Sequence, residues 1–81
     1  MLLNVKLFAR ASELAGASEV QLKLPANSTV AEFRKALVVQ HSALAPVISS
    51  LFVAIDAEYA NDDQTISESA EIACFPPVSG G

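Results

Sequence analysis

Two short segments near the start of the chain alternate apolar and polar residues, as half-buried β-strands do. In residues 2–9 (LLNVKLFA) the apolar face carries Leu3, Val5 and Leu7, and residues 19–24 (EVQLKL) repeat the same alternation. An amphipathic helix would instead need a period of about 3.6 residues. Because only a short connection separates the two segments, we expect them to be neighbouring strands that pair antiparallel.

Two further segments are expected to be helical. RASELAG (10–16) predicts a short helix closed by Gly16, a residue that readily takes the left-handed conformation at a helix end. A longer helix is expected to begin after Thr29, which forms a capping-box pattern with Glu32, and to end near His41. Its apolar stripe, suited to lying on a sheet, consists of Val30, Phe33 and Leu37.

The second half of the chain predicts two or three more strands. Residues 51–56 are expected to form a buried strand, 57–60 a brief strand, 61–70 a polar loop and 71–75 the last strand, after a loop with a helical turn at 42–50. This order predicts one α+β domain, with a mixed sheet of four to five strands packed on one main helix. By analogy of order and size with ubiquitin-like β-grasp domains, the first and last strands are expected to pair in parallel at the centre.

Composition narrows the class of protein. Hydrophobic residues make up 52% of the 81 residues and charged residues 17%, the reverse of a disordered chain. One cysteine allows no internal disulfide, and no apolar run approaches the roughly 20 residues of a membrane span, so we expect a soluble cytoplasmic protein.

Charge is distributed unevenly along the chain. All five basic residues lie within the first 35 positions, whereas the remaining residues hold six acids and no base. This acidic half argues against nucleic acid as a partner and favours a protein with a basic surface. The alternative is that these charges only keep the protein in solution.

No catalytic or metal-binding set is evident within the predicted domain. A single His41 and a single Cys74 cannot form a closed metal site. We expect His41 to lie at the helix end or on the surface and Cys74 to be a small buried hydrophobic residue. Asp62 and Asp63 are interpreted as solvated turn residues. The chain is therefore predicted to have no active site of its own.

The ending FPPVSGG separates a domain at residues 1–75 from a functional tail at 76–81. Pro76 and Pro77 cannot extend a sheet and favour an extended path, so the tail would reach roughly 18–20 Å. Val78 and Ser79 lead to Gly80 and Gly81, which have no Cβ and suit a channel as narrow as the backbone. The reactive group at the tip is the Gly81 carboxylate. The alternative is an ordinary frayed terminus.

Four motifs spread along the chain resemble those of a known family. The motifs FPPVSGG (75–81), FARASELAG (8–16), LPANSTVAEF (24–33) and FVAIDAEY (52–59) together resemble the small, sulfur-carrying subunits of molybdopterin synthase, of MoaD type, across essentially the whole chain. One departure is SAEIA (69–73), where Ser69 and Ala70 replace the first residues of a Gly-Asp-Glu turn common in the family.

The resemblance implies a ubiquitin-like fold and a non-catalytic sulfur-donor subunit within a heterotetrameric synthase. An adenylating enzyme would use ATP to convert the Gly81 carboxylate into an acyl adenylate, and sulfur would then replace AMP to leave a glycyl thiocarboxylate. In the large catalytic subunit, this sulfur would pass to a pterin precursor to build the dithiolene of molybdopterin, during molybdenum cofactor biosynthesis. The carrier itself would bind no cofactor.

A partner must also hold the body of the carrier. Ordering the four tail residues from Val78 to Gly81 costs about 4–8 kcal/mol, and glycine offers little apolar area in return. Phe8 and Phe75 lie on the non-core phase of their strands and are candidate docking residues, with Tyr59 as a third. The alternative is that the loop at 42–50 covers this face of the sheet, which would place both phenylalanines in the core.

Two other functions share a Gly-Gly ending. One is a sulfur carrier for thiazole synthesis in thiamine formation, against which the preceding PPVS argues. The other is a ubiquitin-like modifier, whose Gly81 would form isopeptide bonds with lysines.

Overall fold

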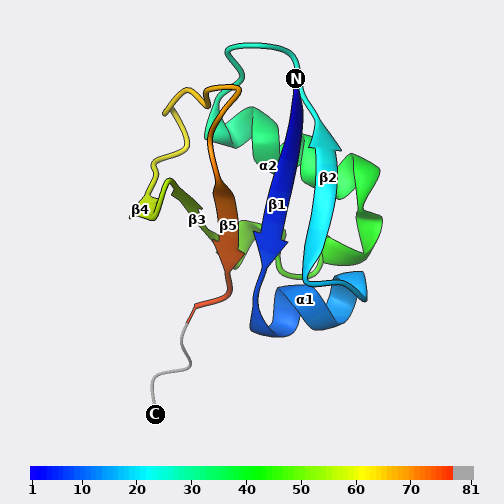
Figure 1. Cartoon of the computed structure of the whole chain (residues 1–81). Coiled ribbons are helices and arrows are strands. Elements are labelled where there is room, and N and C mark those ends of the chain that lie inside the picture. Colours follow the sequence, from blue (N-terminus) through cyan, green and yellow to red (C-terminus); the bar gives the residue numbers. More distant parts are fainter. Residues whose placement is uncertain (78–81) are drawn as a thin grey trace.

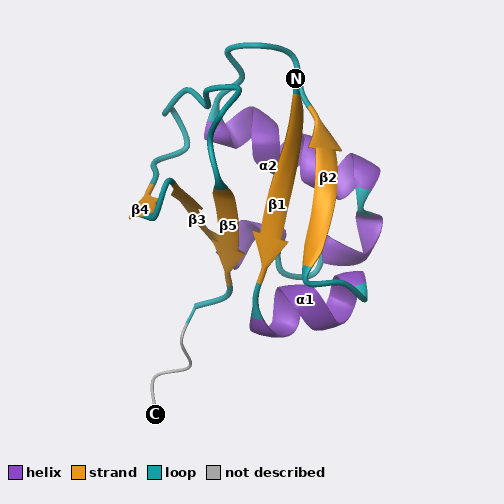
Figure 2. Ribbon diagram, in the orientation of Figure 1, coloured by secondary structure: helices purple, strands orange, loops and turns teal. Residues whose placement is uncertain are grey.

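The computed structural model describes residues 1–77 and contains five strands and two α-helices (Figures 1 and 2). The predicted α+β class is confirmed, and the sheet has five strands, the larger of the two expected numbers. Two short 3₁₀ helices, η1 and η2, replace the single helical turn expected between the main helix and the third strand. The elements are β1 (Leu2–Leu7), α1 (Ala9–Ala15), β2 (Glu19–Lys23), α2 (Val30–Gln40), η1 (Ser42–Leu44), η2 (Ile48–Ser50), β3 (Phe52–Ile55), β4 (Glu58–Tyr59) and β5 (Ile72–Phe75).

The sheet has the strand order β2-β1-β5-β3-β4. The first and last strands, β1 and β5, pair in parallel at its centre, with Val5 opposite Ile72 and Leu7 opposite Cys74. The pairs β1–β2, β3–β5 and β3–β4 are antiparallel. This mixed sheet with one long helix across it is the ubiquitin-like β-grasp arrangement, as predicted.

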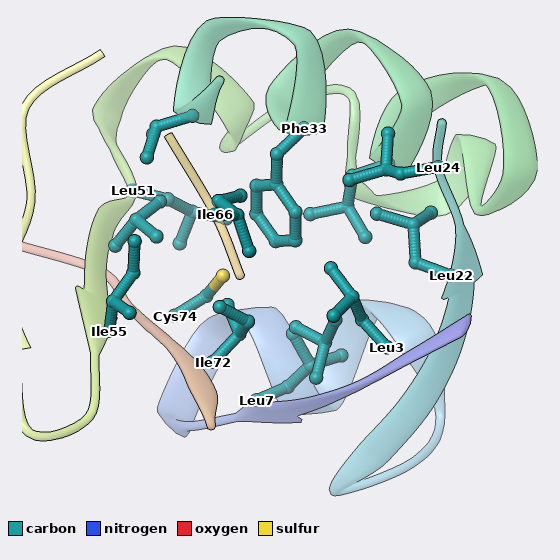
Figure 3. Close-up of a cluster of buried hydrophobic side chains, with 14 of the residues drawn as sticks. Leu3, Leu7, Leu22, Leu24, Phe33, Leu51, Ile55, Ile66, Ile72 and Cys74 are labelled. Atoms are coloured by element: carbon teal, nitrogen blue, oxygen red, sulfur yellow. The ribbon is translucent and has the colours of Figure 1, made fainter. Parts of the chain in front are cut away.

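Helix α2 forms the second layer, behind the sheet in the view of Figure 1. It starts where expected, because Thr29 and Glu32 form the capping box in both directions. Phe33 is fully buried, and its ring points from the helix into the side chains of the strands (Figure 3). The predicted stripe of Val30, Phe33 and Leu37 is thus the helical side of the core.

Helix α1 closes one end of this core. It starts one residue earlier than expected, at Ala9, and ends at Gly16, which has a φ of 70°. The Gly16 N–H donates to the carbonyl oxygens of Ser12 and Glu13, as in a left-handed helix cap. Ala11 is the buried residue of this short helix and joins the main core.

Two expectations for the second half of the chain were wrong in detail. Residues 51–56 were expected to be buried, but Phe52 is 49% exposed, because Leu51, Val53 and Ile55 occupy the inward positions of this segment. The loop at 61–70 is polar except for two buried residues, Ala70 at its end and Ile66, which lies in the core between the helix and the sheet. Its N–H donates to the Ser28 carbonyl oxygen, which ties this loop to the start of α2.

Side chains from the end of α2 cover the outer edge of β2. The amide group of Gln40 accepts from the Lys23 N–H at 3.0 Å and donates to the Lys23 carbonyl at 2.8 Å. His41 is the C-terminal cap of α2, as expected, and its Nε2 lies 2.7 Å from the Gln21 carbonyl oxygen. These backbone groups of the edge strand β2 are therefore bonded within the chain and are not free to pair with a strand of another molecule.

Within residues 1–77, no helix has the length and apolar character needed to cross a membrane.

Candidate functional site

The sheet surface turned away from α2 carries most of the aromatic residues of the chain. Of the five aromatic residues, only Phe33 is in the core. The other four lie at the outward positions of the strands or directly after them, and we call this surface the open face. It consists of Lys6, Phe8, Phe52, Ala54, Tyr59, Ala73 and Phe75.

The four aromatic rings of the open face form two pairs. Phe8 and Phe75 stack with centroids 4.8 Å apart and planes 9° apart. Phe52 and Tyr59 meet at 5.7 Å with a tilt of 57°. Tyr59 is 76% exposed and Phe8 is 43% exposed, so a large apolar area faces solvent. Contiguous exposed apolar surface of this kind is typical of interaction sites.

A groove of about 390 Å³ runs between these aromatic residues. Ala54 and Ala73 are directly opposite each other on β3 and β5, so two methyl groups stand where larger side chains would fill the space. Lys6 and Glu71 add one positive and one negative side chain to the lining. The groove can therefore accept an apolar side chain of a partner, with charged groups close by. Its lining residues are Lys6, Phe8, Ala54, Ala57, Tyr59, Glu71, Ile72, Ala73 and Phe75.

The open face adjoins the start of the predicted tail. The Phe8 N–H donates to the Cys74 carbonyl oxygen at 3.2 Å, which holds the end of β1 beside the end of β5. Phe75 is the last residue of β5, and Pro76 and Pro77 follow it outside the sheet (Figure 1). The predictions for Val78, Ser79, Gly80 and Gly81 lie outside the described residues.

The three predicted docking residues are thus brought together on one surface. Phe8 and Tyr59 are exposed, and Phe75 is partly buried against Phe8. The loop at 42–50 instead packs on the helices, with Leu44 buried in the core, so the alternative in which it covers both phenylalanines does not apply. The docking role of these residues stays a prediction.

The candidate reactive residues of the domain lie elsewhere. Cys74 is fully buried, and burial raises the pKa of its thiol to about 12, so the thiolate nucleophile is disfavoured. Asp62 accepts from the Arg34 Nε at 2.9 Å, and Asp63 is exposed. Among the described residues, no three His, Cys, Asp or Glu side chains gather in a metal-binding arrangement.

Sequence reasoning missed two residues of this surface, Phe52 on the open face and Ala57 in the lining of the groove. Strict alternation from Leu51 through Val53 to Ile55 would have placed Phe52 on the outward side. Nothing in the residue type of Ala57 indicates a surface role.

The sheet order, the parallel central pair and the long helix define a ubiquitin-like β-grasp protein whose aromatic open face adjoins a diproline. The chain belongs to the ThiS family, whose sequence profile matches residues 5–81.

Individual relatives agree with this assignment. The molybdopterin synthase sulfur carrier subunit of Arabidopsis thaliana is 38% identical over 79 residues, which cover 98% of this chain and 82% of that protein. The crystal structure of SAMP1 from Haloferax volcanii matches with a TM-score of 0.86 and 32% identity over 100% of both chains. A complex of subunits 1 and 2 of molybdopterin-converting factor from Helicobacter pylori 26695 contains a chain of the same fold, with a TM-score of 0.70 and 18% identity over 100% of both chains.

Proposed function

We propose that this chain is the sulfur-carrier subunit of a molybdopterin synthase and that it delivers sulfur from the carboxyl group of Gly81. Its similarity to the Arabidopsis thaliana sulfur carrier subunit over nearly the whole chain supports this proposal. The Helicobacter pylori complex of subunits 1 and 2 supports a large subunit as partner. Residues 1–75 would supply the binding surface, and residues 76–81 the reactive arm.

The chemistry requires an activated carboxyl group, because a carboxylate is a poor electrophile. An adenylating enzyme would transfer AMP from ATP to the Gly81 carboxylate and release pyrophosphate. A reduced sulfur donor would then displace AMP and leave a thiocarboxylate. In the large subunit, this soft nucleophile would form a C–S bond to the pterin precursor in place of a C–O bond, whose oxygen leaves with the displaced group. Hydrolysis of the acyl–sulfur bond would then leave the sulfur on the pterin and return Gly81 to a carboxylate.

One observation carries the proposal: the aromatic groove ends at Phe75, directly before the diproline of the tail. A partner that binds the open face is therefore beside the point at which the arm begins. The six residues from Pro76 to Gly81 would carry the reactive carbon roughly 18–20 Å from that point when extended. Docking would thus raise the effective concentration of the thiocarboxylate in the active site of the partner.

Intact-mass spectrometry tests the covalent step. The chain is produced with its adenylating enzyme and a sulfur donor, and a thiocarboxylate adds the mass difference between one sulfur and one oxygen atom. The matched control is a chain that lacks Gly81, which should fold with an unchanged Tm and acquire no sulfur. Sulfur acquired by the shortened chain, or none acquired by the full chain, would contradict the proposal.

A ubiquitin-like modifier is the second candidate function, because SAMP1 matches the whole chain at 32% identity. In that case the activated Gly81 would be attacked by lysine amines, and conjugates of higher mass would appear in cells that contain the adenylating enzyme. A sulfur carrier for thiazole synthesis would instead become thiocarboxylated but would not support molybdopterin formation with the large subunit.

A further inference from the structure

The turn between β3 and β4 has an unusual backbone for its sequence. It joins Ile55 to Glu58 through two residues, Asp56 with a φ of 51° and Ala57 with a φ of 69°. Two-residue hairpin turns with positive φ at both positions favour glycine second, because a Cβ in the left-handed region crowds the following carbonyl oxygen. Ala57 has that Cβ and no polar side chain to compensate for it.

The conformation of this turn is fixed by its neighbours. The Asp56 N–H donates to the Glu71 carbonyl oxygen at 2.9 Å, and the Glu71 N–H donates to the Asp56 Oδ1 at 2.9 Å. These two bonds attach the turn to the residue before β5 and leave Ala57 little freedom to relax. Elsewhere in residues 1–77, positive φ occurs at Gly16 (70°) and Asn27 (65°), which suit it, and at Ala9 (51°), the first residue of α1, which is not among the residues that line the groove.

Ala57 also lines the groove of the open face, together with Phe8, Tyr59 and Phe75. A residue held in an unfavourable conformation beside a candidate binding site is where a functional reason for that conformation is expected. Replacing it with glycine would relieve the backbone but remove one methyl group from the groove lining.

We propose that the methyl group of Ala57 is a contact for the docking partner and is retained at the expense of fold stability. The inference rests on the proposed function, in which the open face binds the large subunit of the synthase. It makes Ala57 a residue that sets affinity for that partner, although its small size and exposed position give no such indication.

Ala57→Gly separates stability from binding. Relief of the left-handed alanine should raise Tm by roughly 2–6 °C, as measured by thermal unfolding of the full chain. Loss of the one methyl group that the partner would bury should weaken binding of the purified large subunit about fourfold, as measured by calorimetry. The two changes are opposite in sign, which general damage to the fold would not produce.

Two further variants control for side effects of glycine. Asn27→Gly changes another residue with positive φ, outside the groove lining, and should leave affinity unchanged. Ala57→Asn tolerates the left-handed conformation without the freedom of glycine and places a polar amide in the groove, so it should also weaken binding.

The outcomes separate the inference from the proposed function. Full affinity in Ala57→Gly, or a Tm that does not rise, would overturn the inference alone. If the unmodified chain does not bind the large subunit, the proposed function and this inference both fail.

Discussion

Tyr59→Ala directly tests whether the open face is the docking surface. Tyr59 is in the two-residue strand β4, and its main aromatic neighbour is Phe52. Because 76% of Tyr59 is exposed, the residue contributes little to the core, and its surface remains available to a partner. The substitution should therefore affect binding more than folding.

The size of the effect follows from that exposure. Burying a whole large apolar side chain contributes about 1.5–3 kcal/mol. A partner that covers the 76% of Tyr59 still in solvent would gain about 1–2 kcal/mol, so Tyr59→Ala should raise Kd roughly 5- to 30-fold. The lost pairing with Phe52 should cost the fold about 0.5–1.5 kcal/mol, which lowers Tm by several degrees without unfolding the protein at room temperature.

Isothermal titration calorimetry against the purified large subunit measures the change in Kd. Val39→Ala is the matched control, because Val39 is 81% exposed but lies on α2, in the other layer of the molecule. It should leave Kd unchanged. If Tyr59→Ala binds as tightly as the unmodified chain, or if Val39→Ala loses as much affinity, the open face is not the docking surface.

Further predictions concern the stability and protection of the fold at Cys74, Gln40, Thr29 and Glu32. Since burial raises the pKa of Cys74 from 9.0 to about 12, its thiol should resist iodoacetamide until urea unfolds the chain. Below pH 9.0 the thiol is neutral in both the folded and the unfolded chain, so the stability of the fold does not depend on its ionisation. As the pH rises from 9.0 toward 12, the thiol ionises only in the unfolded chain, which lowers the free energy of unfolding. Urea midpoints should therefore fall less steeply over that range in Cys74→Ala than in the unmodified chain. Gln40→Ala removes both side-chain bonds to the Lys23 backbone and should speed hydrogen exchange at the Lys23 amide, measured by NMR; unchanged exchange would show that the edge is protected otherwise. Thr29→Ala removes a helix cap and should cost about 0.5–2 kcal/mol in urea unfolding. Hydrogen bonding from the Thr29 backbone lowers the pKa of Glu32 below 4.5. The stability that the Glu32 carboxylate contributes is therefore present above pH 4.5 and is lost as the pH falls through the lowered pKa. If the urea midpoint of Glu32→Gln falls just as steeply as that of the unmodified chain over this range, this prediction is wrong.

The elements with one buried face could be predicted from the sequence because burial imposes a period. The alternation in residues 2–9 and 71–75 predicted the inward faces of β1 and β5, and the stripe through Phe33 predicted that of α2. Local chemistry supplied the boundaries, since Gly16 ends α1 and the Thr29 capping box starts α2. These features depend on neighbouring residues in the chain, so the sequence carries them directly.

The open face and its groove could be predicted only in part, because their shape depends on how distant strands align. Phe52 is in an uninterrupted apolar run, which is also typical of a strand buried on both faces. The small side chains of Ala54 and Ala73 leave space for the groove because the β3–β5 register places them opposite each other. These two residues are nineteen positions apart in the sequence. The left-handed conformation of Ala57 could not be predicted from the sequence, since Asp-Ala is not a usual residue pair for a two-residue turn with positive φ at both positions.

The edges of the sheet indicate how a partner can bind. Another chain could extend a sheet only by bonding to unpaired backbone groups of an edge strand. On β2, the Gln40 amide already bonds both backbone groups of Lys23, and His41 bonds the Gln21 carbonyl. On the opposite edge, β4 has only two residues, too short a template for stable pairing. Recognition of the described part of the chain therefore falls to side chains, and the open face has the aromatic content that dominates binding energy in protein interfaces.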